Sequence, residues 1–314
     1  DLAAMGAEPL LALLSLGLPP TMPVSFLDEL YAGFLEALGE SATIAGGNLS
    51  SVEREWFLDA TLMGSTPRGA ALGRDGARVG DRVFVTGWPG RSAAGLSILR
   101  HLESAGVHSV EDVAHWVQGE AWARPLLDAY LSPTARLDVG VLLREADGTG
   151  AVIDVSDGLA GDLGHLCRAS RVGAELRSEA LCQDPLLGRL AERQDLGGQS
   201  GLTALAASDD YELLFTARSE SADRIAEVLS RQTGTRITGI GVVVPPEAGL
   251  TLLEGAARRP LDRRSQRASK IKSDRVRKAC DGFDVATRRG NARVSKARRD
   301  RFRLRQQPAP ARSR

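Results

Sequence analysis

The sequence predicts an α/β (α+β) protein with two domains. Its 314 residues are 43% apolar, which supplies enough hydrophobic side chains for two cores. Through the second half, strand-like apolar runs alternate with segments of helical periodicity, a pattern typical of an α/β sandwich. Turn residues gather between residues 73 and 81, and we place the domain boundary there. The prediction is therefore an N-terminal domain over residues 1–76, an α/β domain over residues 77–255 and a tail over residues 256–314.

Charge separates the tail from the body. The net charge is zero, but residues 258–314 hold 21 Lys and Arg against five Asp and Glu, so the preceding residues are strongly acidic. A basic segment with few aromatic residues is typical of disorder. No apolar run reaches the roughly 18 residues that a membrane span needs, and the three cysteines lack metal or disulfide spacing. We expect a cytoplasmic protein with no membrane partner.

The N-terminal domain is expected to contain a short helix end, three strands and one helix. Residues 1–6 resemble the end of a helix that Gly6 stops, which indicates that the chain is a fragment. Ser25 and Asp28 resemble a capping box at the start of a helix. We expect strands over residues 9–18, 43–48 and 56–63, the second of which runs into a glycine loop at Gly46 and Gly47.

The second half is expected to continue as strands and helices. We expect strands over residues 82–87, 151–153, 211–216 and 236–243. We expect helices opening at residues 92–96 and 159, and spanning residues 134–145, 184–192 and 221–231. Folded structure should end near residue 255.

The most informative stretch is residues 153–159, a corner between a strand and a helix. Alternation along a strand places Asp154 and Ser156 on one face, and Ser156 or Asp157 stands where a helix needs an N-cap. Two carboxylates so close repel each other unless a cation lies between them. A divalent metal that carries a nucleotide phosphate would relieve that repulsion, and a helix N-terminus also favours phosphate. The alternative is a capping Asp beside a solvated loop Asp.

Three further pieces are weaker when each is taken alone. The glycines before Asn48 would let backbone approach a ligand, or form a plain turn. The acidic cluster over residues 208–212 could bind a substrate, or be a solvated strand entrance. Arg74 could contact phosphate, or be an ordinary surface arginine. No phosphate-binding P-loop and no arrangement for covalent catalysis is present in the sequence.

Together, and in this order, these pieces resemble the thiamine-phosphate kinase family. That family belongs to the superfamily of aminoimidazole ribonucleotide synthetase and selenophosphate synthetase. The resemblance covers residues 1 to about 250. It is carried by residues 1–6, Gly46 to Asn48, Arg74 with Gly80 and Asp81, residues 85–87 with 92–96, Pro133 with Arg136, residues 153–159 and residues 208–215.

The resemblance implies transfer of the γ-phosphate of ATP to thiamine monophosphate, by direct in-line transfer with several Mg²⁺ ions. This mechanism needs positioning and charge neutralisation rather than covalent chemistry. It also implies the two-domain synthetase-superfamily fold and a homodimer formed through the first domain. The implied catalytic residues are Asp154 and Asp157; the implied metal ligands are Asp1, Asn48, Asp154 and Asp157; the implied ATP contacts are Gly47, Asn48, Arg74 and Ser156; and Asp209 would face the thiamine phosphate.

The chain departs from the family pattern at several positions. Asn48 stands where the family has aspartate, so one metal site loses a charge. Asp209 stands where the family has glutamate, and the family's glycine–aspartate-rich N-terminal motif and aromatic C-terminal contact have no counterpart. We therefore expect weak or absent activity from this chain. The alternatives are an inactive kinase-like protein whose basic tail binds nucleic acid, which we favour less, and a relative that phosphorylates another acceptor.

Overall fold

The computed structural model describes residues 1–40, 42–196, 205 and 208–261, all within one compact unit, Asp1–Arg275. The described strands form a three-stranded and a seven-stranded sheet, which confirms the mixed α/β class. The division into domains at residue 76 stays a prediction. From residue 262 onward, the predicted tail lies outside the described residues. No helix among the described residues is long and apolar enough to cross a membrane.

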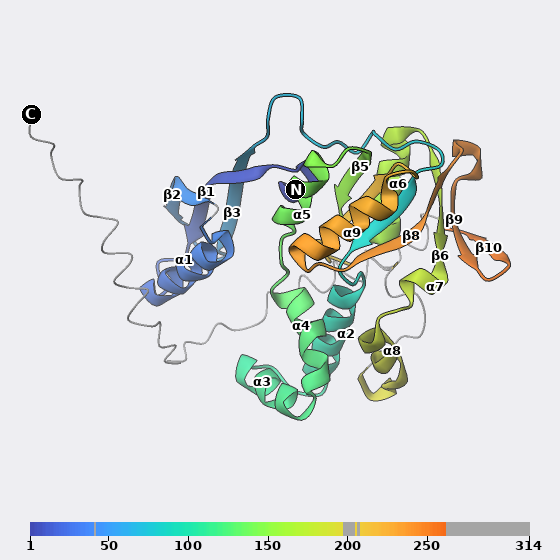
Figure 1. Ribbon diagram of the computed structural model, residues 1–314. Helices are drawn as coiled ribbons and strands as arrows, with labels where there is room; N and C mark the ends of the chain where they lie inside the picture. Colours follow the sequence, from blue (N-terminus) through green and yellow to red (C-terminus); the bar gives the residue numbers. More distant parts are fainter. Residues whose placement is uncertain (41, 197–204, 206–207, 262–314) are drawn as a thin grey trace, which may run out of the picture. The chain divides into compact units, whose positions relative to one another are not determined.

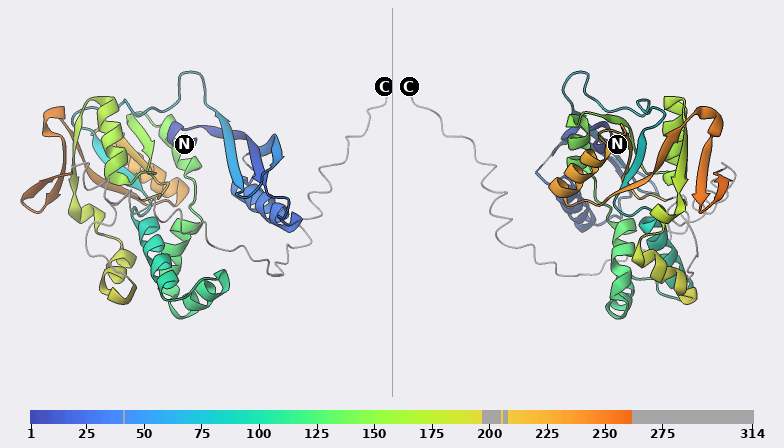
Figure 2. Two further views of the ribbon diagram at one scale, coloured as in Figure 1. Left: turned by 180° about the vertical axis from the view of Figure 1, so that it is seen from behind. Right: turned by 45° about the vertical axis from the view of Figure 1, so that its right-hand side comes forward.

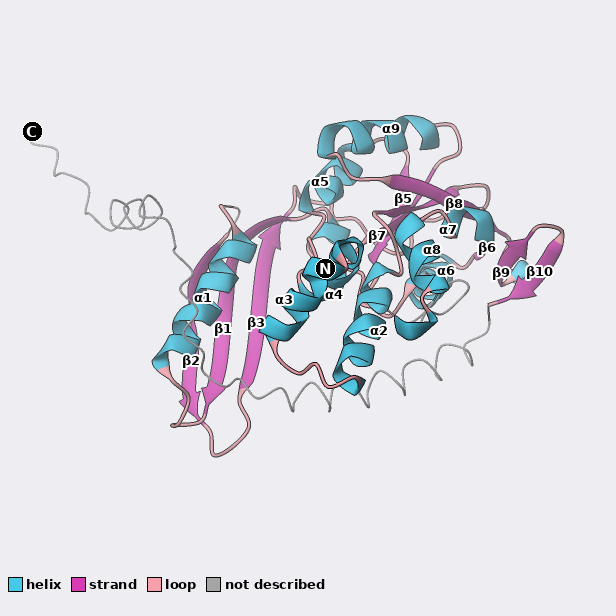
Figure 3. Cartoon of the chain, turned by 90° about the horizontal axis from the view of Figure 1, so that it is seen from below, coloured by secondary structure: helices cyan, strands magenta, loops and turns pink. Residues whose placement is uncertain are grey.

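The smaller sheet contains β1 (Glu8–Leu18), β2 (Thr43–Ser51) and β3 (Phe57–Ser65) in the order β2-β1-β3. β1 pairs parallel with β2 and antiparallel with β3. α1 (Val24–Leu38) runs alongside these strands and contacts β2 (Figure 3). The capping-box prediction is wrong, because Pro23 is the N-cap of α1 and Ser25 already lies in the first turn. A side-chain hydroxyl inside the first turn cannot occupy the cap position.

The glycines before Asn48 lie inside a strand, so the prediction of a glycine loop is wrong. A Cβ added to Gly47 would lie 1.8 Å from the carbonyl oxygen of Leu14. Only glycine therefore lets β2 approach β1 this closely. The β1–β2 register also shifts between Ala12 and Leu13, next to Gly46. The glycines build the sheet rather than interrupting it.

The larger sheet has the strand order β10-β9-β6-β8-β4-β7-β5. Its strands pair antiparallel except for β6 and β9, which are parallel. β5 is an edge strand, so its outer side is open to other segments of the chain. The strands are β4 (Arg82–Thr86), β5 (Thr149–Asp154), β6 (Gly173–Arg177), β7 (Leu213–Ala217), β8 (Ile237–Val244), β9 (Leu250–Glu254) and β10 (Ala257–Pro260).

Helices cover both faces of this sheet, as expected of an α/β sandwich (Figures 1 and 2). α5 (Leu137–Glu145) and α9 (Ala222–Thr233) pack in one core cluster with Phe84 and Phe215. α6 (Leu159–Ser170) packs in the other cluster with Val83 and Val85. Successive β4 side chains alternate between the two clusters, as the pleat of a strand requires. α5 begins at Leu137, three residues later than predicted.

A separate cluster of apolar side chains joins α2 (Arg91–Ser104), α3 (Val110–Gly119), α4 (Arg124–Leu131) and α8 (Pro185–Glu192). The remaining α-helix, α7 (Ser178–Leu181), precedes α8 and is one turn long. Single turns of 3₁₀ helix occur at Ala3–Met5, Ala121–Ala123, Gln194–Leu196 and Pro246–Ala248. Gly6, in the left-handed region at φ 63°, ends the first of these turns, as predicted.

Folded structure continues beyond residue 255, contrary to prediction. Gly255 adopts a φ of 60° and turns the chain from β9 into β10. Arg258 then pairs with Glu175 at 2.8 Å. The first arginines of the basic segment therefore belong to a hairpin of the large sheet, in which β10 pairs with β9.

Candidate functional site

The corner after β5 is built around one buried carboxylate. β5 ends at Asp154, and α6 begins at Leu159 after Gly158, whose φ is 93°. The carboxylate of Asp162, 3% exposed, accepts hydrogen bonds from the backbone N–H groups of Ser156 and Asp157, each at 2.9 Å. The side chain of Ser156 is half-buried and that of Asp157 is exposed. Asp162 therefore holds the turn from inside.

The N-cap prediction for this corner is wrong. Gly158 is the N-cap of α6, and no side chain caps it. The amides of Ser156 and Asp157 point to Asp162, one helical turn further along the chain. Both amides precede the N-cap, so the expectation that the N-terminus of α6 favours a phosphate stays a prediction. The sequence alone did not single out Asp162. Its position five residues after Asp157, in the first turn of the helix, could have indicated that its side chain reaches back to the corner.

Three carboxylates gather at this corner. The pKa of Asp162 is raised to about 6, chiefly by burial; the two hydrogen bonds oppose the rise, and the nearby carboxylates of Asp157 and Asp154 add to it. The repulsion foreseen between Asp154 and Asp157 therefore extends to a third acid. Such a local field favours a cation.

The second acidic motif lies directly beside the first. Val155, in the middle of the corner, accepts a hydrogen bond from Tyr211 N–H and donates one to the carbonyl oxygen of Glu212, both at 2.8 Å. β7 pairs with β5, and Asp154 lies opposite Leu213. The fold thus brings together two motifs that are more than 50 residues apart in sequence, at one end of the sheet.

Asp210 ties this second motif to α2. Its buried carboxylate accepts hydrogen bonds from Gly90 N–H at 2.8 Å and Ser92 N–H at 3.1 Å. Burial raises its pKa to about 6, although these hydrogen bonds oppose the rise. The reading of residues 208–212 as a solvated strand entrance is therefore wrong for Asp210. Asp209, the predicted substrate contact, is half-buried next to it.

Glu212 forms a buried network that the sequence did not reveal. Arg136 donates to both of its carboxylate oxygens, at 2.6 and 2.7 Å, and Thr86 donates a further hydrogen bond to it. The bidentate bond to Glu212 raises the pKa of Arg136. Gly87 must lack a side chain, because a Cβ there would lie 1.9 Å from Glu212 Oε1. The sequence alone did not show that Glu212 requires a glycine at position 87, because the two residues lie far apart along the chain.

A cavity of about 170 Å³ opens beside this network. Its walls combine aromatic, hydroxyl and charged groups. They include Trp88, Arg91, Ser132, Arg136, Asp210 and Glu212. Arg236 stacks over the Trp88 ring, with its guanidinium carbon 4.0 Å from the ring centroid. Asp210 and Glu212 line this cavity, and Asp209 is not among its lining residues.

Two of the predicted site residues lie on segments that contact β5. The backbone around Arg74 is held there, since Val152 N–H donates to the carbonyl oxygen of Gly73 at 2.9 Å and Ser170 donates to that of Arg74 at 3.1 Å. Asp1 opens the short N-terminal 3₁₀ turn, which contacts β5 and α5. Both segments therefore meet the strand that carries Asp154.

Gly47 and Asn48 lie in the smaller sheet. The side-chain amide of Asn48 donates to Ser50 Oγ at 2.7 Å. Across the described residues, no group of three or more His, Cys, Asp or Glu side chains is arranged to hold a metal ion. Within the described residues, a metal site would therefore have fewer than three carboxylate ligands. Its other protein ligands would be hydroxyl or amide oxygens.

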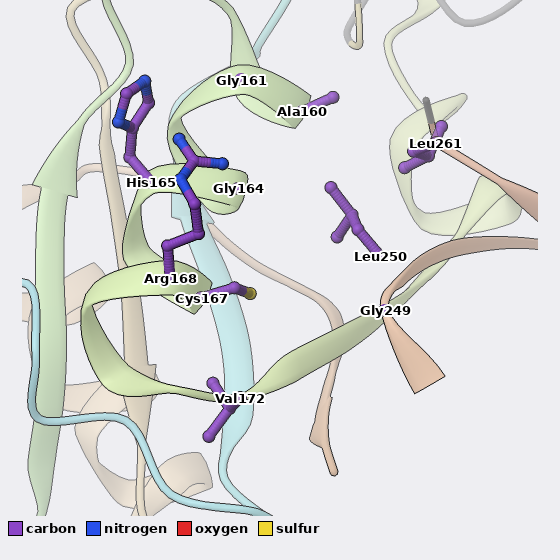
Figure 4. Close-up of a pocket in the computed structure, with 10 residues that line it drawn as sticks. All are labelled: Ala160, Gly161, Gly164, His165, Cys167, Arg168, Val172, Gly249, Leu250 and Leu261. Atoms are coloured by element: carbon purple, nitrogen blue, oxygen red, sulfur yellow. The ribbon is translucent and has the colours of Figure 1, made fainter. Parts of the chain in front are cut away.

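A second cavity, of about 440 Å³, runs along α6 (Figure 4). Gly161 and Gly164 leave one wall as bare backbone, and Leu250 and Leu261 stand opposite. The cavity begins near the acidic corner, because a Cβ on Gly161 would lie 3.7 Å from Asp157 Cβ. Arg168 and His165 give it basic groups.

Two family models match the chain. The AIR synthase related protein family matches through its N-terminal domain over residues 1–66 and its C-terminal domain over residues 78–251. The second match alone covers more than half of the chain and includes both acidic motifs of the corner.

Curated relatives and solved structures agree with this match. Thiamine-monophosphate kinase of Salmonella typhimurium is 35% identical over 262 residues, 81% of this chain and 71% of that protein. The Aquifex aeolicus enzyme is 35% identical over 69% of this chain, which spans 64% of its length. A crystal structure of the Stenotrophomonas maltophilia enzyme has a TM-score of 0.67 at 31% identity, over 82% of this chain and 76% of that one. AaThiL complexed with AMPPCP and TMP has a TM-score of 0.64 at 33% identity, over 80% and 72%.

Proposed function

This chain belongs to the thiamine-monophosphate kinase family, and we propose that it transfers the γ-phosphate of ATP to thiamine monophosphate to give thiamine diphosphate. Relatives at 35% identity carry that name, and AaThiL was solved with AMPPCP, an analogue of ATP, and TMP together. The family foreseen from the sequence is thereby confirmed. The activity and its substrates come to this chain from relatives that it spans by 64% to 71% of their length.

The observation that carries the proposal is the pairing of Val155 with Tyr211 and Glu212. It sets Asp154 and Asp157, for the nucleotide, beside Asp209, for the acceptor. Phosphoryl transfer needs two substrates held in line and their charges neutralised, with little covalent work from the protein. Adjacent acidic motifs at the ends of neighbouring strands would hold the two substrates close together.

The residues at the corner fit Mg²⁺. This ion is usually held by one or two carboxylates together with substrate phosphates and water, rather than by a cage made only of protein. Asp154 and Asp157 would hold it; Asp1, the third carboxylate expected from the sequence, does not form a metal-holding group of three with them among the described residues, and Asn48 stays a predicted ligand. When bound, Mg²⁺ would neutralise the phosphate charge that builds up during transfer.

The remaining residues bind and orient the substrates. Ser156, half-buried at the corner, would donate its hydroxyl to a phosphate oxygen. Arg74 would contact the triphosphate as a cation from beside β5, and Gly47 and Asn48 would reach it from the smaller sheet. Asp209 would orient the acceptor. Glu212, fixed by Arg136 and Thr86, keeps the strand behind Asp209 rigid.

A second copy of the chain is the partner that we propose. The smaller sheet exposes large apolar side chains, among them Leu49, Phe57 and Leu62. Large apolar side chains left exposed on a sheet of a folded protein are typical of an interface. The family resemblance implies a homodimer formed through the first domain, and we propose that this sheet is its interface. We place the protein in the cytoplasm.

The activity is tested by following thiamine diphosphate formation with the complete gene product, by chromatography and ³¹P NMR. We expect product only with ATP, thiamine monophosphate and Mg²⁺ all present. Asp154→Asn and Asp157→Asn should each lower the rate by about 100-fold or more, because each removes a charged metal ligand.

Asp223→Asn is the matched control, since that aspartate is exposed at the start of α9 and pairs with Arg82. Its rate should equal that of the unaltered protein. A folded complete protein that hydrolyses ATP equally well without thiamine monophosphate, or that ignores both corner substitutions, contradicts the proposed function.

A further inference from the structure

Tyr211 has a backbone conformation that is unusual for its residue type. Its φ of 51° lies in the left-handed region, which a bulky L-residue rarely adopts. Among the described residues, the other non-glycine residue with a positive φ is Arg171, at 57°. Arg171 is the C-cap of α6, where a left-handed residue commonly ends a helix. Tyr211 lies in the irregular segment before β7, so a helix end does not explain its conformation.

The two neighbours of Tyr211 hold it in this conformation. The buried carboxylate of Asp210 accepts hydrogen bonds from backbone N–H groups at the start of α2. The buried carboxylate of Glu212 is held at both oxygens by Arg136. Between them, Tyr211 N–H donates to the carbonyl oxygen of Val155 at 2.8 Å. Strained residues persist only where their surroundings fix them from several sides, and such residues cluster at ligand sites.

The side chain of Tyr211 is presented to solvent beside the predicted acceptor contact. Tyr211 is 45% exposed, although the residues before and after it are buried. It follows Asp209 by two positions, and its own N–H group bonds the acidic corner at Val155. An aromatic ring offers a large, rigid contact surface at a binding site. The feature to explain is therefore an exposed ring on a backbone that the fold holds under strain.

The chemistry of the proposed acceptor suits this ring. Thiamine monophosphate contains a thiazolium ring, which is flat and positively charged. The face of a tyrosine ring attracts a cation through its quadrupole, and neighbouring carboxylates add to that attraction. Asp209 stands next but one to Tyr211 and supplies such a carboxylate. A positively charged heteroaromatic ring is thus the class of ligand that this position would recognise.

We propose that Tyr211 determines acceptor specificity by packing its ring against the thiazolium ring of thiamine monophosphate. The anchors at Asp210 and Glu212 impose the left-handed backbone, which directs the ring to the acceptor. This inference rests on the proposed function for the identity of the acceptor. It adds a substrate contact that neither the sequence motifs nor the predicted site residues included.

Three substitutions in the complete gene product test the ring. Tyr211→Phe keeps the ring, whereas Tyr211→Gly and Tyr211→Ala remove it. Isothermal titration with thiamine monophosphate, in the presence of AMPPCP and Mg²⁺, should show binding about tenfold weaker for Gly and Ala, and within about twofold of the unaltered protein for Phe. Thiamine without phosphate should lose affinity by the same factor, because the contact is to its ring. The affinity for AMPPCP with Mg²⁺ should not change.

Comparing Gly with Ala at the same position tests the backbone. Both variants lack the ring, but only glycine adopts a φ of 51° without strain. Tyr211→Gly should therefore unfold at a temperature about 3 °C higher than Tyr211→Ala. Arg171 is the matched control, because its φ is similar and a helix end explains it. Arg171→Gly should likewise unfold at a higher temperature than Arg171→Ala, and both should bind thiamine monophosphate as the unaltered protein does.

The results that would overturn the proposal are distinct from failure of the proposed function. Unchanged acceptor affinity in Tyr211→Gly overturns it, and this variant relieves strain and so is the one expected to fold. An equal loss in Tyr211→Phe also overturns it, because the hydroxyl and not the ring would then make the contact. Equal unfolding temperatures for Tyr211→Gly and Tyr211→Ala would show that the backbone is unstrained and contradict the positioning. An unaltered protein that forms no thiamine diphosphate refutes the proposed function, and the acceptor role of Tyr211 with it.

Discussion

The two sheets of this protein differ in how completely their own chain covers them. All five residues of β7 are buried, and so are four of the five in β4. By contrast, β2 and β3 are exposed along nearly their whole length, and α1 has no buried residue. The large sheet has helices on both faces, while the small one has a single helix. The contrast teaches that the described helices bury most of the large sheet, whereas they leave much of the small sheet exposed.

The largest difference in stability is expected between two Leu→Ala substitutions, one in each region. Leu166 is fully buried under the large sheet, whereas Leu62 on β3 is 46% exposed. Leu166→Ala should lower the free energy of unfolding by about 3 kcal/mol, through lost burial and a cavity. Leu62→Ala should cost less than about 1 kcal/mol in the monomer. Urea denaturation of both variants measures the difference, and equal losses would break the comparison.

Neighbouring glycines of β2 test whether the small sheet is formed as described. A Cβ on Gly47 would collide with the Leu14 backbone, whereas one on Gly46 finds nothing nearer than 4.0 Å. Both have a φ near 155°, so both substitutions strain the backbone. Gly47→Ala should therefore destabilise the sheet by about 2 kcal/mol more than Gly46→Ala. Protection of the β1 and β2 amides from hydrogen exchange reports this, and similar protection in both variants would mean that the strands are not packed this closely.

Buried carboxylates make the stability of the large-sheet region depend on pH. Burial raises the pKa of Asp210 to about 6, above its ordinary 3.8. A raised carboxyl pKa contributes stability that is complete below the ordinary value and is lost as pH rises through about 6. Asp210→Asn should remove this loss, of order 2 kcal/mol, and flatten the stability profile between pH 4 and 7. An unchanged profile from urea denaturation across that range would contradict the raised pKa.

The smallest effect is expected at the surface of the well-covered region. Arg82 pairs there with Asp223, whose side chain is 86% exposed. Solvent screens such pairs, so Asp223→Ala should change the free energy of unfolding by less than about 0.5 kcal/mol. Thermal unfolding measures it. A loss comparable to that of Leu166→Ala would show that the stability of this region does not come from its core.

The sequence located all three strands of the small sheet but only four of the seven in the large one, where it missed β6, β9 and β10. Runs such as residues 82–87 and 211–216 are apolar because helices cover both faces, and each proved to be a strand within two residues. In the small sheet, the glycines at 46 and 47 read as a loop, because the close approach to Leu14 that requires them is a contact between distant segments. Local pattern does not encode such contacts.

The candidate site divides in the same way. Asp154 and Asp157 were found because they are adjacent in sequence to the corner that they form. Asp162, Arg136 and Glu212 were missed as structural partners, since each acts through a hydrogen bond that only the folded chain creates. Gly158, the true N-cap of α6, carries no side chain that could have marked it. The sequence motif thus identified the acidic residues of the site. Only the fold showed which groups hold those residues in place.

The central claim is that the two acidic motifs form one site around a metal-bound nucleotide. Paramagnetic broadening by Mn²⁺, added with ATP to ¹⁵N-labelled protein, tests it directly. Manganese should broaden the amide signals of residues 154–158 and 209–212 together, and Asp157→Asn should reduce both effects. Broadening of one motif without the other, or of neither at saturating ATP, would contradict the account.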